Sequence, residues 1–221
     1  MPKRNAERNE QLVSKKPKVE ENPTDFIEEV DELFFLMVQS DYLQGFQLMY
    51  GMGKGRDQLK GVEWFEKAAR NDHALAKVHL ARALALGESI KEDREKAEQL
   101  GSEAYGEITV KAGQGDADAQ LCLGELLFEG LGISEDKQQA IEWFEKAAKQ
   151  GNAVAQNNLG WVFGYGIGAR KNTLLSVEWY TKAAKQGHAH SQYALANHYK
   201  NEENFGEAVK WYTKAAEQNH I

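Results

Sequence analysis

The stretch GELLFEGLGISEDKQQAIEWFEKAA, residues 124–148, contains a spacing of glycine and tryptophan that occurs twice more in the chain. A first glycine is followed six residues later by a second, two residues later by a third, and eleven residues after that by tryptophan. The same spacing is found in GFQLMYGMGKGRDQLKGVEWFEKAA (45–69) and in GWVFGYGIGARKNTLLSVEWYTKAA (160–184). Recurrence at a fixed spacing predicts a protein built from repeats.

The segment YGMGKGR, residues 50–56, has the glycines and basic residues of a phosphate-binding loop, but its spacing is that of the repeat. Gly51 and Gly53 occupy the second and third glycine positions. No stretch reads GxxxxGK[ST], the pattern of a P-loop. We therefore expect each glycine pair to end one helix and to supply the positive φ of the following turn. No nucleotide site is expected here.

Two further copies depart from the pattern. LARALALG (80–87) precedes the helical stretch DREKAEQLGSEAYGEITVKA (93–112), which is seven residues longer than its counterparts. Seven residues are about two helical turns and shift the helix face by only ~20°, so the same face should point inward. The last copy, YALANHYKNEENFGEAVKWYTKAA (193–216), lacks the glycine pair, and a tight turn from Glu202 to Phe205 should replace it.

Each unit has the pattern of two helices. The first places small and apolar residues four apart, as in Ala155, Leu159 and Phe163. The second has an apolar stripe in which we expect Trp143 and Trp179 to be core residues. A unit of this size cannot bury its apolar face alone, so neighbouring units should stack into an all-α solenoid.

The pattern AxxxLGxxYxxGxG…WYxKAA resembles that of the Sel-one-like repeat family, which is related to tetratricopeptide repeats. It is carried here by Ala155, Leu159, Gly160, Gly166, Gly168, Trp179, Tyr180, Lys182, Ala183 and Ala184. The resemblance covers roughly residues 38–221 and implies a right-handed α-solenoid of about five helix-turn-helix repeats. It also implies an adaptor or scaffold role in protein complexes. Some relatives are rich in cysteine, and this chain, whose single cysteine is Cys122, departs from that branch.

The chain divides into a tail, residues 1–21, and a repeat domain, residues 22–221. The first 22 residues have a net charge of +2, whereas the remaining residues have a net charge of −9. The tail lacks apolar periodicity, and we expect it to be disordered. Ahead of the first repeat, NPTDFIEEVDELFFLMVQ (22–39) reads as an amphipathic helix that caps the open face of repeat one. Its apolar side chains are Ile27, Val30, Leu33, Phe34 and Met37.

Two basic clusters in the tail match the bipartite pattern of nuclear import signals. They are Lys3 with Arg4, and Lys15 and Lys16 with Lys18, separated by a ten-residue spacer. This pattern predicts a nuclear import receptor as a partner and a nuclear location, the alternative being a solvated tail on a cytoplasmic protein.

Composition excludes several other classes. No apolar run approaches the ~18 residues of a membrane span, and no apolar segment follows the basic N-terminus as in a secretory signal. One cysteine fits a reducing compartment, and Cys122 lies in an apolar helical stretch, where we expect a buried small side chain. A body with a net charge of −9 argues against nucleic-acid binding.

No catalytic residue, cofactor or metal site is expected. Neither a Ser/His/Asp pattern nor HExxH is readable, and the six histidines lack zinc-ligand spacing. His73 and His188 occupy the same repeat position as Asp116 and Asn152, so this position calls for a polar turn residue.

The first helices of the repeats should line a groove. Aligned on the Leu-Gly pair, the positions expected there are Tyr42, Phe46, Val78, Arg82, Leu121, Glu125, Asn157, Trp161, Tyr193 and Asn197. Trp161 stands out because the matched positions hold other residue types, so the fold does not require an aromatic there. The mixture of aromatic, amide and charged groups suits an extended peptide or a partner helix.

The sequence thus predicts a non-catalytic scaffold that binds a protein or peptide partner, with no nucleic acid and no membrane. The alternative is a regulatory subunit or a microbial effector that modulates an enzyme partner, and a third reading is an enzyme. The closing EQNHI (217–221) resembles a linker, so we expect the last helix face to meet a partner or a further segment. The partner and the oligomeric state are not readable from the sequence.

Overall fold

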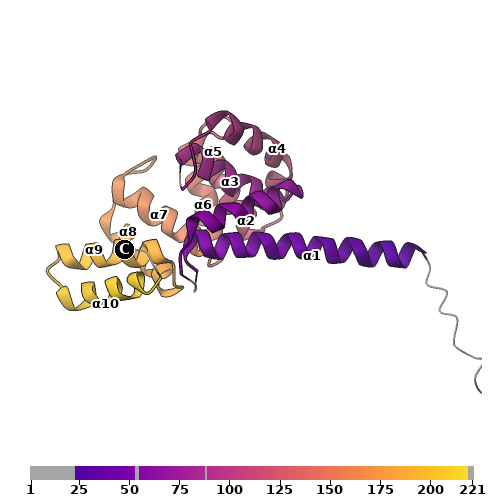
Figure 1. The fold of residues 1–221 in the computed structure, drawn as a ribbon. Coiled ribbons are helices and arrows are strands. Elements are labelled where there is room, and N and C mark those ends of the chain that lie inside the picture. The colour runs from indigo at the N-terminus through magenta and orange to yellow at the C-terminus, as the bar shows by residue number, and fades with distance from the viewer. Residues whose placement is uncertain (1–22, 53–54, 88, 219–221) are drawn as a thin grey trace, which may run out of the picture. The chain divides into compact units, whose positions relative to one another are not determined.

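The computed structural model describes residues 23–52, 55–87 and 89–218, and within these ranges it contains ten α-helices and no strand (Figure 1). The helices are α1 (Pro23–Tyr50), α2 (Gln58–Arg70), α3 (Ala74–Leu86), α4 (Arg94–Gly113), α5 (Ala117–Glu129), α6 (Lys137–Lys149), α7 (Ala153–Tyr165), α8 (Thr173–Lys185), α9 (Ala189–Asn201) and α10 (Phe205–Ala216). Two units divide the chain, residues 1–36 and residues 37–221.

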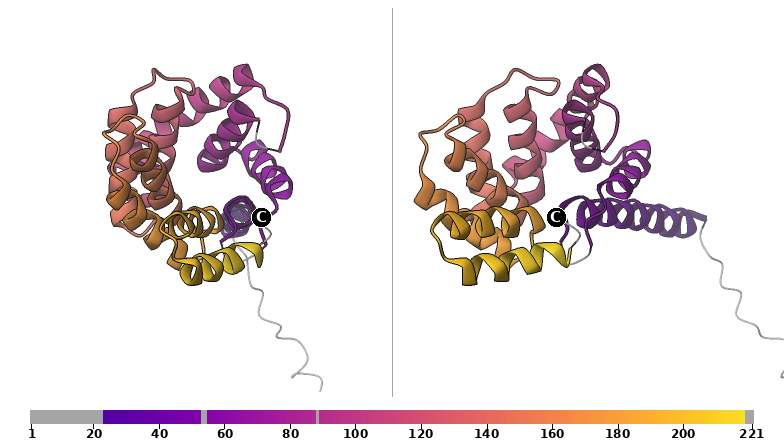
Figure 2. Two further views of the ribbon diagram at one scale, coloured as in Figure 1. Left: turned by 90° about the vertical axis from the view of Figure 1, so that its left-hand side faces the viewer. Right: turned by 60° about the vertical axis from the view of Figure 1, so that its left-hand side comes forward.

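Within residues 37–221, helices pack against their neighbours in sequence. The pairs are α3 with α4, α5 with α6, α7 with α8, and α9 with α10, and the second helix of each pair packs on the first helix of the next. Figure 2 shows these helix pairs following one another along a curved path. Extensive packing between units that are neighbours in the sequence is the mark of a solenoid, so the predicted all-α repeat architecture is confirmed.

Side-chain caps begin the helices at a fixed repeat position. Asp116 accepts a hydrogen bond from the backbone N–H of Ala119, at 2.8 Å, and in repeat two the Nδ1 atom of His73 accepts from Ala76, at 3.2 Å. These bonds satisfy an amide that has no partner within the helix. Asn152 and His188 cap α7 and α9 in the same way. The position expected to hold a polar turn residue is therefore a helix N-cap.

Glycine serves two different purposes in the repeat. Gly130 ends α5 with a φ of +63°, which only glycine adopts without strain, as the glycine-pair prediction required. Gly124, the first glycine, lies against the ring of Phe144, and a Cβ atom there would come within 2.5 Å of it. Gly45 and Gly160 meet the rings of the equivalent aromatic residues in the same way. The small residue lets the two helices of a pair approach closely.

The tryptophan prediction was wrong in detail. Trp143 and Trp179 are half-buried, whereas the residues that follow them, Phe144 and Tyr180, are buried against the glycines. The lysine three residues after each tryptophan lies over its ring, with Lys146 3.6 Å from the centroid of Trp143. The tryptophans therefore lie at the edge of the core, where a cation–π contact covers their outer face.

Buried glutamines join successive repeats. The Nε2 atom of Gln156 donates to the carbonyl of Ala148 at 3.1 Å, and its Oε1 atom accepts from Nε2 of Gln186 at 2.8 Å. Gln120 with Gln150, and Gln192 with Gln218, repeat this arrangement. Each glutamine thus bonds the end of the preceding repeat's second helix on one side and the turn after its own repeat's second helix on the other.

The two irregular repeats have the predicted forms. Helix α4 has 20 residues where α6 and α8 have 13, and its buried residues lie on one face. In the last repeat, α9 ends at Asn201 and α10 begins at Phe205, so a three-residue turn replaces the glycine pair.

The helix expected over residues 22–39 is observed from Pro23 and continues without a break into the first helix of repeat one, as the single 28-residue helix α1. Its capping role stays a prediction. The side chains of Ile27 and Val30 and the tail, residues 1–21, lie outside the described residues. Among those described, no helix combines the length and apolar character needed to cross a bilayer.

Candidate functional site

A cavity of about 340 Å³ opens on the inner face of the repeats, within residues 37–221. First helices α3, α5 and α7 supply most of its wall. It is lined by Met49, Tyr50, Arg56, Arg82, Leu86, Glu125, Phe128, Glu129, Phe144, Asn157, Asn158, Trp161, Val162, His188 and His190. Its volume falls in the range of roughly 300–1,000 Å³ that is usual for ligand pockets.

The first and last repeats together form one side of the cavity. The backbone N–H of Arg56 donates to the carbonyl of Gln218 at 2.8 Å. The rings of Tyr50 and His188 stack with their centroids 6.2 Å apart. The curvature of the repeat unit therefore brings the turn after α1 against the start of α9 and the end of α10.

One wall of the cavity is aromatic. The indole of Trp161 meets the ring of Phe128 edge-on at 5.7 Å and tilts against Tyr165 at 6.0 Å. Trp161 is half-buried, so part of its ring remains open. An indole held between two rings and open on one side offers a rigid apolar contact to a bound group.

Another part of the lining is charged. Glu125 is buried, with its Oε2 atom 3.3 Å from Nδ1 of His79 and its Oε1 atom 3.8 Å from Nε of Arg82. Burial by itself would raise the pKa of Glu125, but His79 and Arg82 hold that pKa below its ordinary value. One turn further along α5, burial raises the pKa of Glu129. The same wall thus carries one carboxylate held in its ionised form and one that protonates more easily.

The last repeat adds histidine to the cavity. Burial lowers the pKa of His190, and the positive charges of Arg56 and Arg82 lower it further. Its Nδ1 atom lies 3.0 Å from Oδ1 of Asn157, which also accepts a hydrogen bond from the hydroxyl of Ser191 at 2.9 Å. His190 is therefore a neutral polar group near pH 7.

The structure brings together four of the ten residues predicted for the groove. Arg82, Glu125, Asn157 and Trp161 all line the cavity, from α3, α5 and α7. Their binding role stays a prediction.

The other six predicted residues lie elsewhere. Tyr42, Val78 and Leu121 are buried in the core, so their side chains do not form an open groove surface. Phe46 is half-buried and packs on Tyr50 and His79. Tyr193 and Asn197 face α10, where the ring of Tyr193 meets Tyr212 and Asn197 accepts a hydrogen bond from the Tyr212 hydroxyl at 2.6 Å.

Sequence reasoning missed two groups of cavity residues. Leu86 and Glu129 lie one helical turn beyond Arg82 and Glu125, so extending the alignment by four residues would have found them. Arg56, His188 and His190 belong to the first and last repeats. No local pattern indicates that these repeats meet, because curvature accumulates over the whole array.

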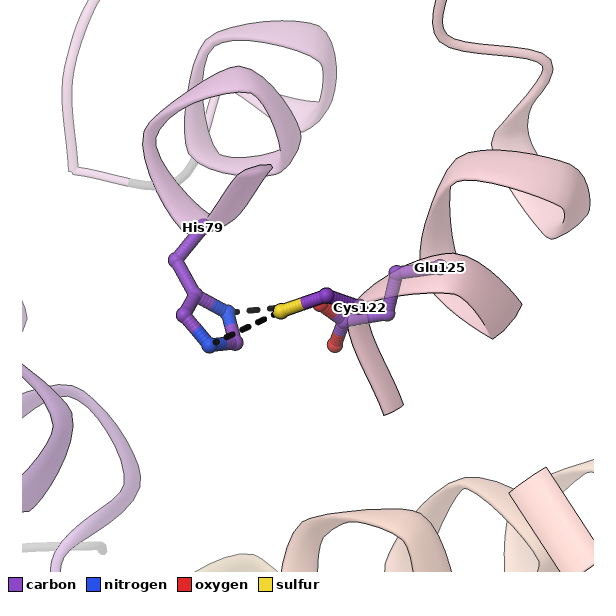
Figure 3. Close-up of side chains that lie close together, drawn as sticks. All are labelled: His79, Cys122 and Glu125. Atoms are coloured by element: carbon purple, nitrogen blue, oxygen red, sulfur yellow. Dashed lines mark hydrogen bonds and ion pairs between the residues drawn. The ribbon is translucent and has the colours of Figure 1, made fainter. Parts of the chain in front are cut away.

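A cluster of metal-ligand side chains lies beside the cavity. His79 on α3 and Cys122 and Glu125 on α5 have ligand atoms within 4.8 Å of one another (Figure 3). Burial raises the pKa of the Cys122 thiol well above its usual range, and the nearby Glu125 carboxylate adds to the shift. A thiol of this kind is a poor nucleophile, because the thiolate is the reactive form.

The model of the Sel1 repeat matches five segments of the chain, residues 41–73, 74–105, 117–152, 153–188 and 189–220. These segments coincide with the five helix pairs, and the gap between the second and third falls in the extended α4. A search of curated proteins found no match.

Three of the solved structures that this chain is similar to come from bacteria. A protective antigen of uropathogenic Escherichia coli with an SLR fold is 25% identical at a TM-score of 0.49, over 82% of this chain and 54% of its own. A Sel1 repeat protein from Oxalobacter formigenes is 26% identical at 0.47, over 81% and 72%. An immunity protein of Pseudomonas aeruginosa is 22% identical at 0.49, over 83% and 67%. The chain thus spans about half the length of the first of these proteins.

Proposed function

The chain belongs to the Sel1 repeat family, and on that premise we propose that it is a non-catalytic scaffold whose inner cavity receives a segment of a protein partner. Proteins of this family typically mediate protein interactions. The segment that fits the cavity has an apolar side chain for the Trp161 wall and a polar or charged group for the wall of Arg82 and Glu125.

The observation that carries the proposal is the placement of Trp161. Its indole lines the cavity, although the repeats do not need an aromatic at this position, since Arg82 and Glu125 occupy it in the two preceding units. An aromatic that the fold does not require, partly exposed in a cavity that is also lined by charged groups, has the features of an interface anchor. Such anchors can be worth ~2 kcal/mol or more of binding free energy.

The test uses a peptide selected from a random library against the full chain, with its Kd measured by fluorescence anisotropy. Trp161→Ala should weaken binding by about 30-fold, the ratio that corresponds to ~2 kcal/mol. Trp143→Ala is the matched control, because that tryptophan is equally half-buried but does not line the cavity, and its Kd should equal that of the wild type. A peptide that binds both variants alike would contradict the proposal.

A nuclear location is the second part of this proposal. Its support is the sequence of the tail alone, with its two basic clusters, since residues 1–21 lie outside the described residues. A fluorescent reporter fused to residues 1–21 should accumulate in the nuclei of cultured cells. Replacing Lys15, Lys16 and Lys18 by alanine should abolish this accumulation. An even distribution of the unaltered fusion would refute nuclear import.

A further inference from the structure

We propose that His79, Cys122 and Glu125 form a binding site for a divalent transition-metal ion, of which Zn²⁺ suits the three ligand types best. The site shares Glu125 with the cavity, but metal binding does not require a partner. It joins the first helices of repeats two and three.

The three side chains lie close enough together to share a single ion, with ligand atoms within 4.8 Å of one another. Cys122 and Glu125 are three residues apart on α5 and so project from one face, toward His79 on α3. Sγ of Cys122 lies 3.7 Å from Nε2 of His79, and Oε2 of Glu125 lies 3.3 Å from Nδ1 (Figure 3). Two ligands of one tetrahedral zinc ion are about 3.3–3.7 Å apart, given bond lengths of about 2.0–2.3 Å.

One adjustment is needed on binding. The sulfur faces one ring nitrogen of His79 and the carboxylate faces the other, whereas one ion takes only one of them. The terminal torsion of a glutamate is broad, so the carboxylate of Glu125 can turn without leaving a rotamer well. The helix backbones need not move.

Burial gives the second, independent reason. His79, Cys122 and Glu125 are 1%, 0% and 1% exposed. Among the described residues, no hydrogen bond of standard geometry reaches either carboxylate oxygen of Glu125. A buried carboxylate is costly unless it is paired, and a bound cation would add a direct ligand bond to the contacts that His79 and Arg82 give Glu125.

The repeat does not demand these residue types. Aligned on the Leu-Gly pair, this position holds Leu43, His79, Cys122, Asn158 and Ala194 in the five repeats. The fold therefore accepts apolar and polar residues there, and only the second and third repeats place a zinc-ligand type at it. These two residues are the ones that lie against each other and against Glu125.

The surroundings complete the site. Glu125 lines the cavity, so a water molecule from the cavity can supply the fourth ligand of a zinc site with three protein ligands. The hydroxyl of Tyr50 lies 3.1 Å from Nδ1 of His79 and can orient the ring, as outer partners of metal-bound histidines do. Thiolate and imidazole ligands select zinc over magnesium and calcium, which prefer oxygen.

The experiment uses the full chain, kept reduced and stripped of metal with a chelator. Co²⁺ should bind in a 1:1 ratio and produce a thiolate-to-cobalt charge-transfer band, and Zn²⁺ should abolish that band by displacing cobalt. Because the thiol must lose its proton, binding should release protons into a weakly buffered solution. Zn²⁺ should also raise Tm, since it binds only the folded state.

Two variants and a control locate the site. Cys122→Ser and Glu125→Gln should each weaken Zn²⁺ binding by at least about tenfold. Glu142→Gln makes the same chemical change at an exposed position of α6 that does not line the cavity, and it should leave the affinity unchanged. Failure of the wild type to bind Co²⁺ stoichiometrically, or a cobalt spectrum without the sulfur band, overturns the proposal. The wild-type spectrum decides this even where a variant does not fold.

Discussion

Replacing Gln156 by methionine should destabilise the repeat unit through the junction between repeats. Methionine has nearly the same length and helix propensity as glutamine, so the change removes hydrogen bonds and little else. Gln156 is 5% exposed and makes two bonds, to the carbonyl of Ala148 and with Nε2 of Gln186.

The size of the destabilisation depends on which hydrogen bonds the partners of Gln156 keep after the substitution. The carbonyl of Ala148 still accepts from the N–H of Gly151 at 3.1 Å, and Gln186 still donates to the carbonyl of Gly151 at 2.9 Å. No buried group is left entirely without a partner, so the loss is two net hydrogen bonds of about 1 kcal/mol each, partly offset by the burial of an apolar side chain. We expect Gln156→Met to lower the free energy of unfolding by about 1–2 kcal/mol.

Urea unfolding followed by circular dichroism measures this change. Gln138→Met is the matched control, since Gln138 is exposed on α6, and its effect should stay within about 0.5 kcal/mol. A double-mutant cycle with Gln186→Met should give a coupling energy of about 0.5–1.5 kcal/mol. A coupling energy near zero, with Gln156→Met no worse than the control, would refute the view that these glutamines join the repeats.

Three further outcomes are expected. Tyr180→Ala should cost about 3–5 kcal/mol of unfolding free energy by leaving a hole against Gly160, whereas Trp179→Ala, at a half-buried site, should cost clearly less, and equal melting curves would contradict this. Burial lowers the pKa of His73 to about 4, below the ~6.5 of an unfolded chain, so the unfolded state binds more protons between these pH values. Stability that is present above pH ~6.5 should therefore fall by roughly 1–2 kcal/mol as pH drops toward 4. Calorimetry should detect this loss in the wild type and less of it in His73→Asp, which copies the cap of α5. Deleting residues 1–21 should leave helicity and Tm unchanged, and a lower Tm would assign the tail a part in folding.

Much of the fold was predictable because its signals are local. The cap at His73 and the positive φ of Gly130 depend on a few neighbouring residues, and the same positions recur in other repeats. The long α4 kept its buried face because two extra turns preserve the helical phase.

The degree of burial of individual side chains was harder to predict. Trp179 and Tyr180 are adjacent in the same motif, and both are large and aromatic. Only the packed structure shows that Tyr180 enters the space left by Gly160 while Trp179 lies under a lysine at the edge. A helix turns by about 100° per residue, so one position decides between the interior and the rim. The sequence pattern identifies the apolar face of the helix, but it does not show which residue of that face points into the core.

The sequence by itself determined the repeat, its helices and their caps, since each of these depends on contacts between residues that are close in the sequence. The tertiary structure alone decided which residues share the cavity. Tyr50 and His188 meet because a small rotation at every junction adds up over five repeats until the first faces the last. His79 and Cys122 lie 43 residues apart and meet because consecutive first helices stack in register. Such distances depend on the sum of many packing geometries, which no single stretch of sequence contains.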